Sequence, residues 1–541
     1  MSAGNLGRHR ALLFLFPFAV AVLLRIYPYL VYGVPYSTDS WSPIRNTEQL
    51  LAYTPTTLGG NPVFDSYNIY WPANSIFGAV ASLVFDVSPI KAMPLVFPIV
   101  ASVSVLVFFL VVERISGSAL VASIASLFLA TAGVDAIFTA AVTKETYAEP
   151  LFMVSILLLL WKTDRRSGAL FAITSVALAL SHHATALVLV VVAAAVVSVD
   201  SLLLARRGEP IGRKPLLVVL SGAVTLAYFL LYADAGLGPL GNLVTVQSAL
   251  LVFAFLTIFI APVAYHAVSR PTRLLLAEGG IVLALAVGVL AIGTSVTLIP
   301  TAPAVTSTLL YSAIPYILGG VLAIFGYRIL HLSRDRRNFA FVASWLAALL
   351  GLGFLAVFSG VADGLDILYR LLAFIGPPAI ILASLALQRA LEGARNRGLA
   401  KALVVAVVLL IAVPSAYQTY AASIQRESLL GGEWAYQRSD LTGAQWVSSN
   451  APPSNFTIAG DLRMQYLLTD YLSVGVNTSS GYHYLENPAS GPRPRYLVTY
   501  GLMDADGYVQ SLYGAQLPGN WSEALAQSSP ALYDNGNIVL W

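Results

Sequence analysis

The chain has 541 residues, of which 57% are hydrophobic and 11% are charged. Soluble globular domains carry about 25% charged residues, so this composition indicates a protein that lies mostly in a lipid bilayer. The net charge of +3 is too small to indicate a nucleic-acid partner. The chain contains no cysteine, which excludes disulfide bonds, thiolate metal sites and cysteine nucleophiles.

The N-terminal apolar run is expected to remain in the protein as an anchor. Residues 11–31 follow Arg8 and Arg10 and lack the small-residue cleavage site of a signal peptide. Arg25 lies in the outer half of this run, where we expect it to pair with a carboxylate.

The rest of the chain predicts an α-helical polytopic membrane protein. A spanning helix needs about 20 apolar residues, and about 13 stretches come close to that length. The stretches 150–162 and 168–181 are short for full spans. The predicted spans are 11–31, 92–112, 116–133, 150–162, 168–181, 184–204, 215–233, 246–267, 274–295, 309–330, 339–358, 369–388 and 401–419.

The basic residues predict the orientation in the membrane. Lys and Arg gather in alternate loops, for example at 206–214 and 334–337, and such loops usually face the cytoplasm. We therefore expect a multi-pass cell-membrane protein with a cytoplasmic N-terminus and, because the number of spans is odd, an external C-terminus. The sequons at Asn455, Asn477 and Asn520 are compatible with that location. These sequons and the missing cysteines fit an archaeal-type membrane.

The composition divides the chain into two predicted domains. Residues 1–420 form the transmembrane domain, and residues 421–541 form a small extracytoplasmic α/β domain. Within the latter we expect a short helix at 440–449, strands at 456–459 and 496–500, and a β-hairpin at 531–541 that turns at Asn535-Gly536.

The first external loop, residues 33–91, is the longest connection between spans and carries Asp39 and Arg45. Loops longer than about 15 residues are usually functional or structured. A carboxylate at the bilayer surface can act as a general base toward a hydroxyl group. The alternative is that Asp39 caps a helix beginning near Ser40. Arg45 is expected either to pair with Asp39 or to contact lipid headgroups.

Later loops add acids and bases on the same side of the membrane. The second loop carries Asp135, Lys144 and Glu145, and a carboxylate there can hold a divalent cation or form an ion pair. The adjacent His182 and His183 point about 100° apart on a helix, so they suit hydrogen bonds to a phosphate or anchoring at the interface better than one shared metal. Arg370 can grip a phosphate or extend to the headgroups.

The residues above give the chain a resemblance to GT-C glycosyltransferases, which use polyprenyl-phosphate-linked sugar donors. This class includes oligosaccharyltransferase catalytic subunits, protein O-mannosyltransferases and aminoarabinose transferases. The resemblance implies that Asp39 is the catalytic Asp and that Arg45 is the Arg that follows it. It implies that Glu145, with Asp135 as the alternative, is the acidic residue of the second loop. Arg370 would then contact the donor phosphate.

The chain also departs from the class. Oligosaccharyltransferases carry a Trp-Trp-Asp-Tyr-Gly motif after the last span, whereas the comparable stretches here, 445–450 and 458–463, lack it. This departure argues against transfer to Asn and favours a glycan, lipid or Ser/Thr hydroxyl as the acceptor. Lys144 stands where a second acid is usual and could replace part of the role of a Mg²⁺ or Mn²⁺ ion.

We therefore predict an integral membrane glycosyltransferase that transfers a sugar from a polyprenyl-phosphate donor to an acceptor hydroxyl on the external face. Asp39 would be the catalytic residue. Arg370, Lys144, His182 and His183 would bind the donor phosphate. The rivals are a secondary transporter, which would place polar residues near the bilayer midplane, and a non-catalytic envelope scaffold or degenerate member of the class.

Overall fold

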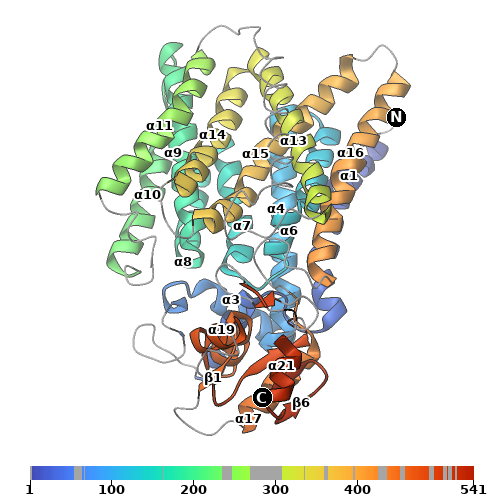
Figure 1. Cartoon of the computed structure of the whole chain (residues 1–541). Coiled ribbons are helices and arrows are strands. Elements are labelled where there is room, and N and C mark those ends of the chain that lie inside the picture. Colours follow the sequence, from blue (N-terminus) through green and yellow to red (C-terminus); the bar gives the residue numbers. More distant parts are fainter. Residues whose placement is uncertain are drawn as a thin grey trace.

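The computed structural model shows a long helical bundle with a small strand-containing region at one end (Figure 1). We call this end, where the C-terminal region packs, the site end of the bundle. The structure describes residues 3–53, 64–65, 67–161, 164–233, 246–268, 307–333, 335–358, 364–393, 397–424, 435–450, 457–486, 493–501, 503, 508–509, 515–517, 519 and 521–541.

Eight described helices are long and apolar enough to cross a bilayer, and a bent pair brings the total to as many as nine. The bent pair consists of α5 (Ala119–Thr131) and α6 (Gly133–Thr139), whose axes differ by 62°. Three further helices are α7 (Lys144–Leu160), α8 (Arg165–Ser181) and α11 (Val246–Val268). The eight are α1 (Ala3–Tyr32), α4 (Pro89–Ser116), α9 (His183–Arg206), α10 (Lys214–Leu231), α13 (Ser307–Leu332), α14 (Arg336–Phe358), α15 (Gly364–Gly393) and α16 (Arg397–Ile424).

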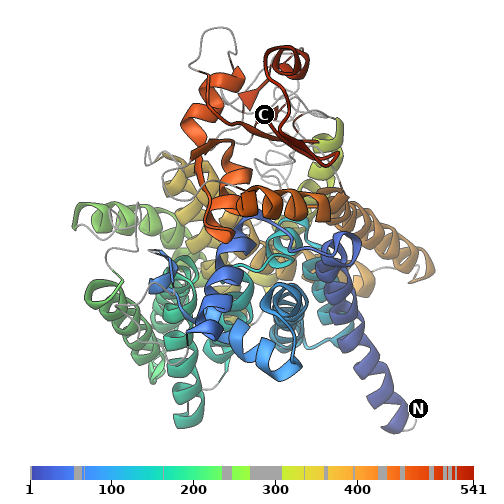
Figure 2. The same ribbon diagram turned by 90° about the horizontal axis from the view of Figure 1, so that it is seen from below.

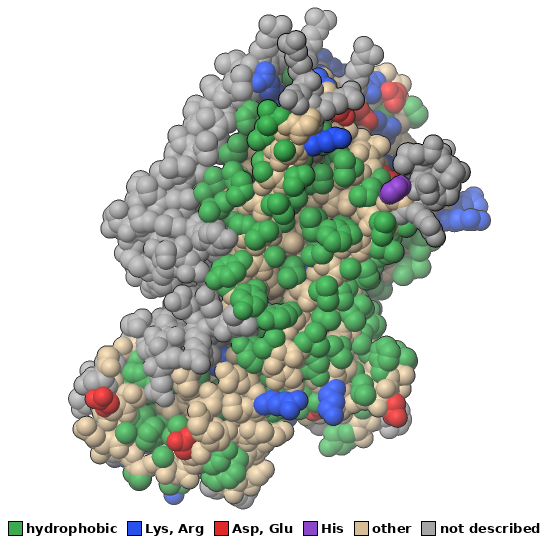
Figure 3. All heavy atoms as spheres, turned by 90° about the vertical axis from the view of Figure 1, so that its right-hand side faces the viewer, with side chains coloured by type: hydrophobic (Ala, Val, Ile, Leu, Met, Phe, Trp, Pro, Cys, Tyr) green, Lys and Arg blue, Asp and Glu red, His purple; other side chains and the backbone are tan. Residues whose placement is uncertain are grey.

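The surface of the bundle matches a bilayer. Hydrophobic side chains cover the middle of the face shown in Figure 3, and Lys and Arg lie toward its ends. Helix α1 exposes Leu12 and Leu23 on its outer side, as a lipid-facing helix does. On its inner side, α1 packs closely against α5, where Ala122 and Ala125 are fully buried. Small residues of this kind allow membrane helices to approach each other closely.

The first loop folds into short helices between the bundle and the C-terminal region. Figure 2, seen from the site end, shows these first-loop helices in blue beside the C-terminal elements in orange and red. The amphipathic helix among them buries Trp41 and Ile44, which anchor it from both sides. The elements are the short η1 (Thr38–Ser40), α2 (Trp41–Ala52), η2 (Asn68–Tyr70) and α3 (Ala73–Phe85).

The C-terminal region has a core of its own, which includes Ile458, Leu468 and Val498 together with Trp41 from α2. β1 and β2 pair in parallel, β3, β7 and β6 form an antiparallel sheet in that order, and β4 pairs with β5. The elements are α17 (Arg438–Asn450), β1 (Thr457–Ala459), α18 (Leu462–Gln465), the π-helix η5 (Tyr466–Tyr471), β2 (Gly475–Asn477), α19 (Thr478–Glu486), β3 (Val498–Tyr500), β4 (Tyr508–Val509), β5 (Ala515–Gln516), α21 (Trp521–Ser528), β6 (Tyr533–Asp534) and β7 (Ile538–Leu540).

Most of the predicted architecture is confirmed within the described residues. The helix at 440–449 forms as α17, and the C-terminal hairpin turns at Asn535-Gly536, where Gly536 has a φ of +81°. The predicted short spans at 150–162 and 168–181 are helices of 17 residues each, α7 and α8. The predicted span at 274–295 lies outside the described residues, as do Asn455 and Asn520. Helical multi-span architecture is therefore shown, with eight or nine candidate spans in the described part instead of about 13.

Candidate active site

Asp39 lies in a constrained turn just after α1. The preceding Ser37 has a φ of +76°, a left-handed conformation that strains an L residue, and its Oγ accepts a hydrogen bond from the Asp39 N–H (3.3 Å). Ser40 donates from its Oγ to the Tyr36 carbonyl and accepts the Val142 N–H (2.8 Å). The turn is therefore held by its own chain and by the second loop.

The Asp39 side chain is half-buried and does not cap α2. Ser40 is the N-cap residue of that helix and makes no side-chain capping hydrogen bond, so the capping interpretation is wrong. Within the part of the chain that the structure describes, no hydrogen bond or ion pair engages the Asp39 carboxylate. Its negative charge nevertheless acts on Tyr67, Lys144 and Asp470, which places these groups around it.

The first loop supplies a second carboxylate, Asp65, which the sequence did not single out. Its Oδ2 accepts hydrogen bonds from Ser42 Oγ (2.5 Å), Asn46 Nδ2 (2.8 Å) and Asn68 Nδ2 (2.7 Å). Its Oδ1 accepts the backbone N–H groups of Tyr67 and Asn68. Burial acts to raise the pKa of Asp65, but these hydrogen bonds outweigh burial and bring the pKa below its ordinary value. Asp65 is therefore an anion held in a fixed orientation.

Lys144 begins α7 and joins the first and second loops. Its ammonium lies 3.6 Å from the centre of the Tyr67 ring and donates to Asn68 Oδ1 (3.0 Å). Burial lowers the pKa of Lys144 to about 7, although the carboxylates of Asp39 and Asp65 act to raise it. The lysine predicted to contact phosphate is therefore a cation that can lose its charge near neutral pH.

Arg370, on α15, brings a second cation to the same place. Its guanidinium carbon lies 5.8 Å from the centre of the Phe138 ring on α6. The Phe138 ring also packs against Tyr369, with ring centres 5.1 Å apart. The charge of Arg370 acts on both Lys144 and Tyr67. The two predicted phosphate ligands thus lie within electrostatic range of each other.

The histidine pair lies beside these cations, at the junction of α8 and α9. His182 Nδ1 is 2.8 Å from Thr185 Oγ1, and burial lowers the pKa of His182 well below its ordinary value. The charges of His183, Lys144 and Arg370 lower that pKa further. The His183 ring packs on Trp71, with ring centres 4.9 Å apart, and its buried Nδ1 has no hydrogen-bond partner among the described residues. A buried ring nitrogen of this kind can serve a polar ligand.

The predicted metal ligands are buried on the bundle side of the site. Glu145 lies in the first turn of α7, and Asp135 on α6 forms an ion pair with Arg25 (2.5 Å). Among the described residues, no three His, Asp or Glu side chains converge in the manner of a metal site. The mechanism below therefore uses no metal. Metal binding by Glu145, or by Asp135, stays a prediction to be tested with a chelator.

Arg45 links the first loop to the C-terminal region. Its Nη1 donates to the backbone carbonyls of Thr469 (3.3 Å) and Asp470 (3.2 Å), in the π-helix η5. The Asp470 side chain approaches the other acids of the site. Burial, reinforced by the charges of Asp65 and Asp39, raises the pKa of Asp470 to about 6, while Arg45 acts to lower it. The C-terminal region thus contributes a third carboxylate.

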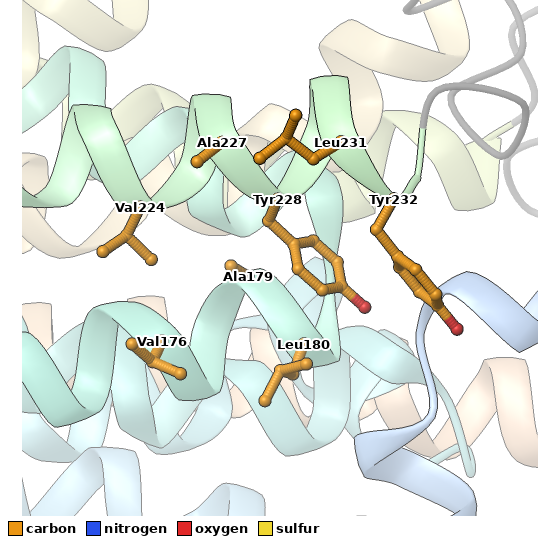
Figure 4. Close-up of a pocket in the computed structure, with 8 residues that line it drawn as sticks. All are labelled: Val176, Ala179, Leu180, Val224, Ala227, Tyr228, Leu231 and Tyr232. Carbon is orange, nitrogen blue, oxygen red and sulfur yellow. The ribbon is translucent and has the colours of Figure 1, made fainter. Parts of the chain in front are cut away.

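An apolar groove of about 390 Å³ runs between α8 and α10 toward this site (Figure 4). At one end of it, the hydroxyls of Tyr228 and Tyr232 donate to the backbone carbonyls of Tyr70 (2.8 Å) and Ile69 (3.1 Å). These carbonyls directly precede Trp71, which packs on His183. The groove therefore ends beside the histidine pair. It is lined by Val176, Ala179, Leu180, Val224, Ala227, Tyr228, Leu231 and Tyr232.

The fold and these residues define a helical membrane protein with acids and cations gathered at one end of the bundle. No family model matches the chain, and no curated protein matches it in sequence. Solved structures do match it. One of them is the archaeal oligosaccharyltransferase AglB from Archaeoglobus fulgidus, in complex with an inhibitory peptide and a dolichol-phosphate. It aligns with a TM-score of 0.60 and 14% sequence identity. The alignment covers 92% of this chain and 70% of that chain. Its apo form aligns with a TM-score of 0.60 at 16% identity, over the same shares of both chains.

ArnT from Cupriavidus metallidurans, bound to undecaprenyl phosphate, aligns with a TM-score of 0.42 at 14% identity over 100% of this chain and 98% of that chain. The Archaeoglobus fulgidus structures align with the higher TM-scores. At these identities the likeness shows the fold alone. The chain therefore has structural similarity to the GT-C polyprenyl-phosphate glycosyltransferases, and the resemblance predicted from the sequence is confirmed at that level.

Proposed function

We propose that the chain is an integral membrane glycosyltransferase that transfers a sugar from a polyprenyl-phosphate donor to an acceptor hydroxyl. The observation that carries this proposal is the position of the Asp39 carboxylate, within electrostatic range of Lys144, which in turn lies within range of Arg370. A general base within electrostatic range of one cation, which itself lies within range of a second, suits a reaction in which a hydroxyl attacks and a phosphate leaves.

In the proposed reaction, Asp39 accepts the proton of the acceptor hydroxyl. The acceptor oxygen then bonds to the anomeric carbon of the donor sugar from the face opposite the phosphate. The bond between the anomeric carbon and the phosphate oxygen breaks, and its electron pair goes to that oxygen. Lys144 and Arg370 stabilise the negative charge that develops there. The attack inverts the configuration of the sugar, as the resemblance to the class implies.

The groove between α8 and α10 gives the lipid of the donor a route to this chemistry. Its apolar lining suits a polyprenyl chain, and its end lies beside Trp71 and His183. A phosphate at that end would meet Lys144 and Arg370, and the buried Nδ1 of His183 would be available to it. His182 and His183 then line the passage between lipid and phosphate.

The acceptor enters from the side of the first loop and the C-terminal region in this proposal. Asp470 joins Asp39 on that side, and carboxylates bind hydroxyl groups by accepting their hydrogen bonds. Asp65, whose oxygens already accept hydrogen bonds from its own loop, holds that loop in shape. Arg45 keeps the C-terminal region attached to α2 through its bonds to η5. The alternation of Lys and Arg among the loops supports an external site and a cytoplasmic N-terminus.

The positions of Asp39, Lys144 and Asp470 favour an enzyme over a secondary transporter. Transporters bind their substrates near the bilayer midplane, between broken helices. Here Asp39, Asp65, Lys144 and Asp470 lie in or next to the loops and the C-terminal region at one end of the bundle. A non-catalytic scaffold would have no need for the strained turn at Ser37 or for a half-buried carboxylate within electrostatic range of a half-buried cation.

The test uses the full chain in lipid nanodiscs, with dolichyl-phosphate mannose and dolichyl-phosphate glucose as donors and a panel of glycan, lipid and peptide acceptors. Mass spectrometry measures the release of dolichyl phosphate. We expect release that depends on an acceptor and that falls at least about 100-fold in Asp39→Asn. Asp86→Asn is the matched control, since Asp86 is an exposed acid of the same loop with a left-handed φ of +52° that Asn tolerates. Equal activity in the two variants would remove Asp39 as the base.

A further inference from the structure

Arg25 is the most deeply buried cation of the described bundle that the proposed reaction does not use. It lies within α1, and its side chain is completely shielded from solvent. Charged groups inside a membrane are costly, so one that is retained there usually serves a function. The predicted pairing with a carboxylate is confirmed, because Nη2 lies 2.5 Å from Asp135 Oδ2.

The guanidinium does more than neutralise one acid. Its Nε donates to Thr139 Oγ1 (2.7 Å), and its Nη1 donates to the Ala130 carbonyl (3.1 Å). Ala130 lies at the end of α5, whereas Asp135 and Thr139 lie on α6, beyond the 62° bend. A helix that breaks leaves backbone carbonyls in need of donors. A single side chain of α1 therefore holds both halves of the broken helix pair.

Both elements that Arg25 joins lead directly into the candidate active site. α1 continues through the strained turn to Asp39. α6 carries Phe138, which lies against Arg370, and continues to Val142, whose N–H bonds to Ser40 (2.8 Å). Two residues later the chain reaches Lys144. The chain that leaves the α5–α6 bend thus contacts Arg370 through Phe138 and then reaches Lys144.

We propose that Arg25 is a positioning residue, which fixes the bend between α5 and α6 and so sets the geometry of Asp39, Lys144 and Arg370. This inference rests on the proposed function for its effect on ligand binding, but its structural part can be tested without any ligand. The planar fork of Arg reaches acceptors on several sides at once, which the single ammonium of Lys does not.

The alternative is that Arg25 only stabilises the bundle, and two variants separate the two roles. Arg25→Met/Asp135→Leu replaces the buried ion pair with apolar side chains, an exchange that is often neutral for stability. Arg25→Lys keeps the charge opposite Asp135 but loses the fork. Arg10→Met is the matched control, because Arg10 lies on the same helix and pairs with Glu113 (2.8 Å) at the far end.

Two measurements are made on each variant in nanodiscs. Hydrogen–deuterium exchange reports on the backbone of residues 133–143, and titration with dolichyl phosphate reports on the site. We expect faster exchange confined to residues 133–143, and binding about tenfold weaker, in both the double variant and Arg25→Lys. In catalysis, a displacement of about 1 Å in an active site can cost about 100-fold in rate, so we expect a smaller loss in binding alone. Arg10→Met should change neither quantity.

The inference is overturned when residues 133–143 of a folded double variant exchange at the wild-type rate. Should the double variant fail to fold, the same result in Arg25→Lys would overturn it. So would weaker binding that tracks a global fall in thermal stability. If the wild-type chain does not bind dolichyl phosphate at all, the proposed function fails. The exchange measurement would then still decide whether Arg25 fixes the bend.

Discussion

Lys144 gives the account its sharpest test, because its charge is expected to change within the working pH range. Its pKa of about 7 results from burial, against the opposing pull of Asp39 and Asp65. A phosphate binds the protonated amine, so binding takes up a proton wherever the amine is neutral. Affinity is therefore full below about pH 7 and is lost as the pH rises above it, by about tenfold per pH unit.

The size of the effect follows from the charges. An ammonium about 4 Å from a phosphate charge, at an effective dielectric constant of about 20, contributes about 4 kcal/mol per unit of charge. The neutral amine lacks that attraction. Phosphate binding to the protein with a neutral Lys144 therefore stays negligible from pH 7 to about pH 9, and the tenfold loss per pH unit continues over that range. Dolichyl phosphate is the probe, because its second pKa is about 6 and its charge is nearly constant above about pH 7. The dissociation constant is measured by microscale thermophoresis in nanodiscs from about pH 7 to pH 9.

Two variants make the test specific to Lys144. Lys144→Met should bind weakly with no dependence on pH in this range, since the titrating amine is gone. Lys144→Arg keeps its charge at every pH used, so its affinity should also be independent of pH but remain higher than that of the Met variant. A wild-type affinity that stays flat from pH 7 to pH 9, or a slope that survives in Lys144→Met, would refute the reasoning.

The other predictions concern the second cation, the link to the C-terminal region and the metal. Arg370→Met should weaken dolichyl phosphate binding by about 1.5–3 kcal/mol. Arg389 is an exposed arginine of the same helix, so Arg389→Met should leave the titration unchanged. Equal effects of the two substitutions would remove Arg370 from the site. Arg45→Met should lower stability by about 1 kcal/mol through loss of two hydrogen bonds to backbone carbonyls, measured by thermal unfolding, and an unchanged melting temperature would contradict that link. Removal of Mg²⁺ and Mn²⁺ with EDTA should leave dolichyl phosphate binding intact, while a loss reversed by added metal would support Glu145 as a ligand.

Local patterns in the sequence predicted much of the fold. Apolar runs located the helices, and Asn535-Gly536 located the hairpin turn, because each depends on neighbouring residues. The bend between α5 and α6 was not predicted. The predicted span 116–133 ends at this point, where Gly133 and Asp135 interrupt the apolar run, but the sequence does not show that a second helix follows at once. The Arg25 side chain that binds the Ala130 carbonyl comes from a helix more than a hundred residues earlier.

The candidate site was predictable only in part, for a similar reason. Asp39, Lys144 and Arg370 were proposed from the sequence because charges near the ends of apolar runs stand out. Asp65 and Asp470 were missed, since each becomes part of the site through partners from other segments. Asp470 follows Arg45 by more than four hundred residues, and its neighbours in sequence give no sign of that contact.

The most direct test of the central claim is a cryo-electron microscopy structure of the chain with dolichyl phosphate in a nanodisc. We expect the phosphate within about 4 Å of Lys144 Nζ and the Arg370 guanidinium, the lipid in the groove between α8 and α10, and the Asp39 carboxylate facing the space beside the phosphate. A phosphate bound elsewhere, or an Asp39 carboxylate that faces away from it, would contradict the proposal that these residues carry out glycosyl transfer.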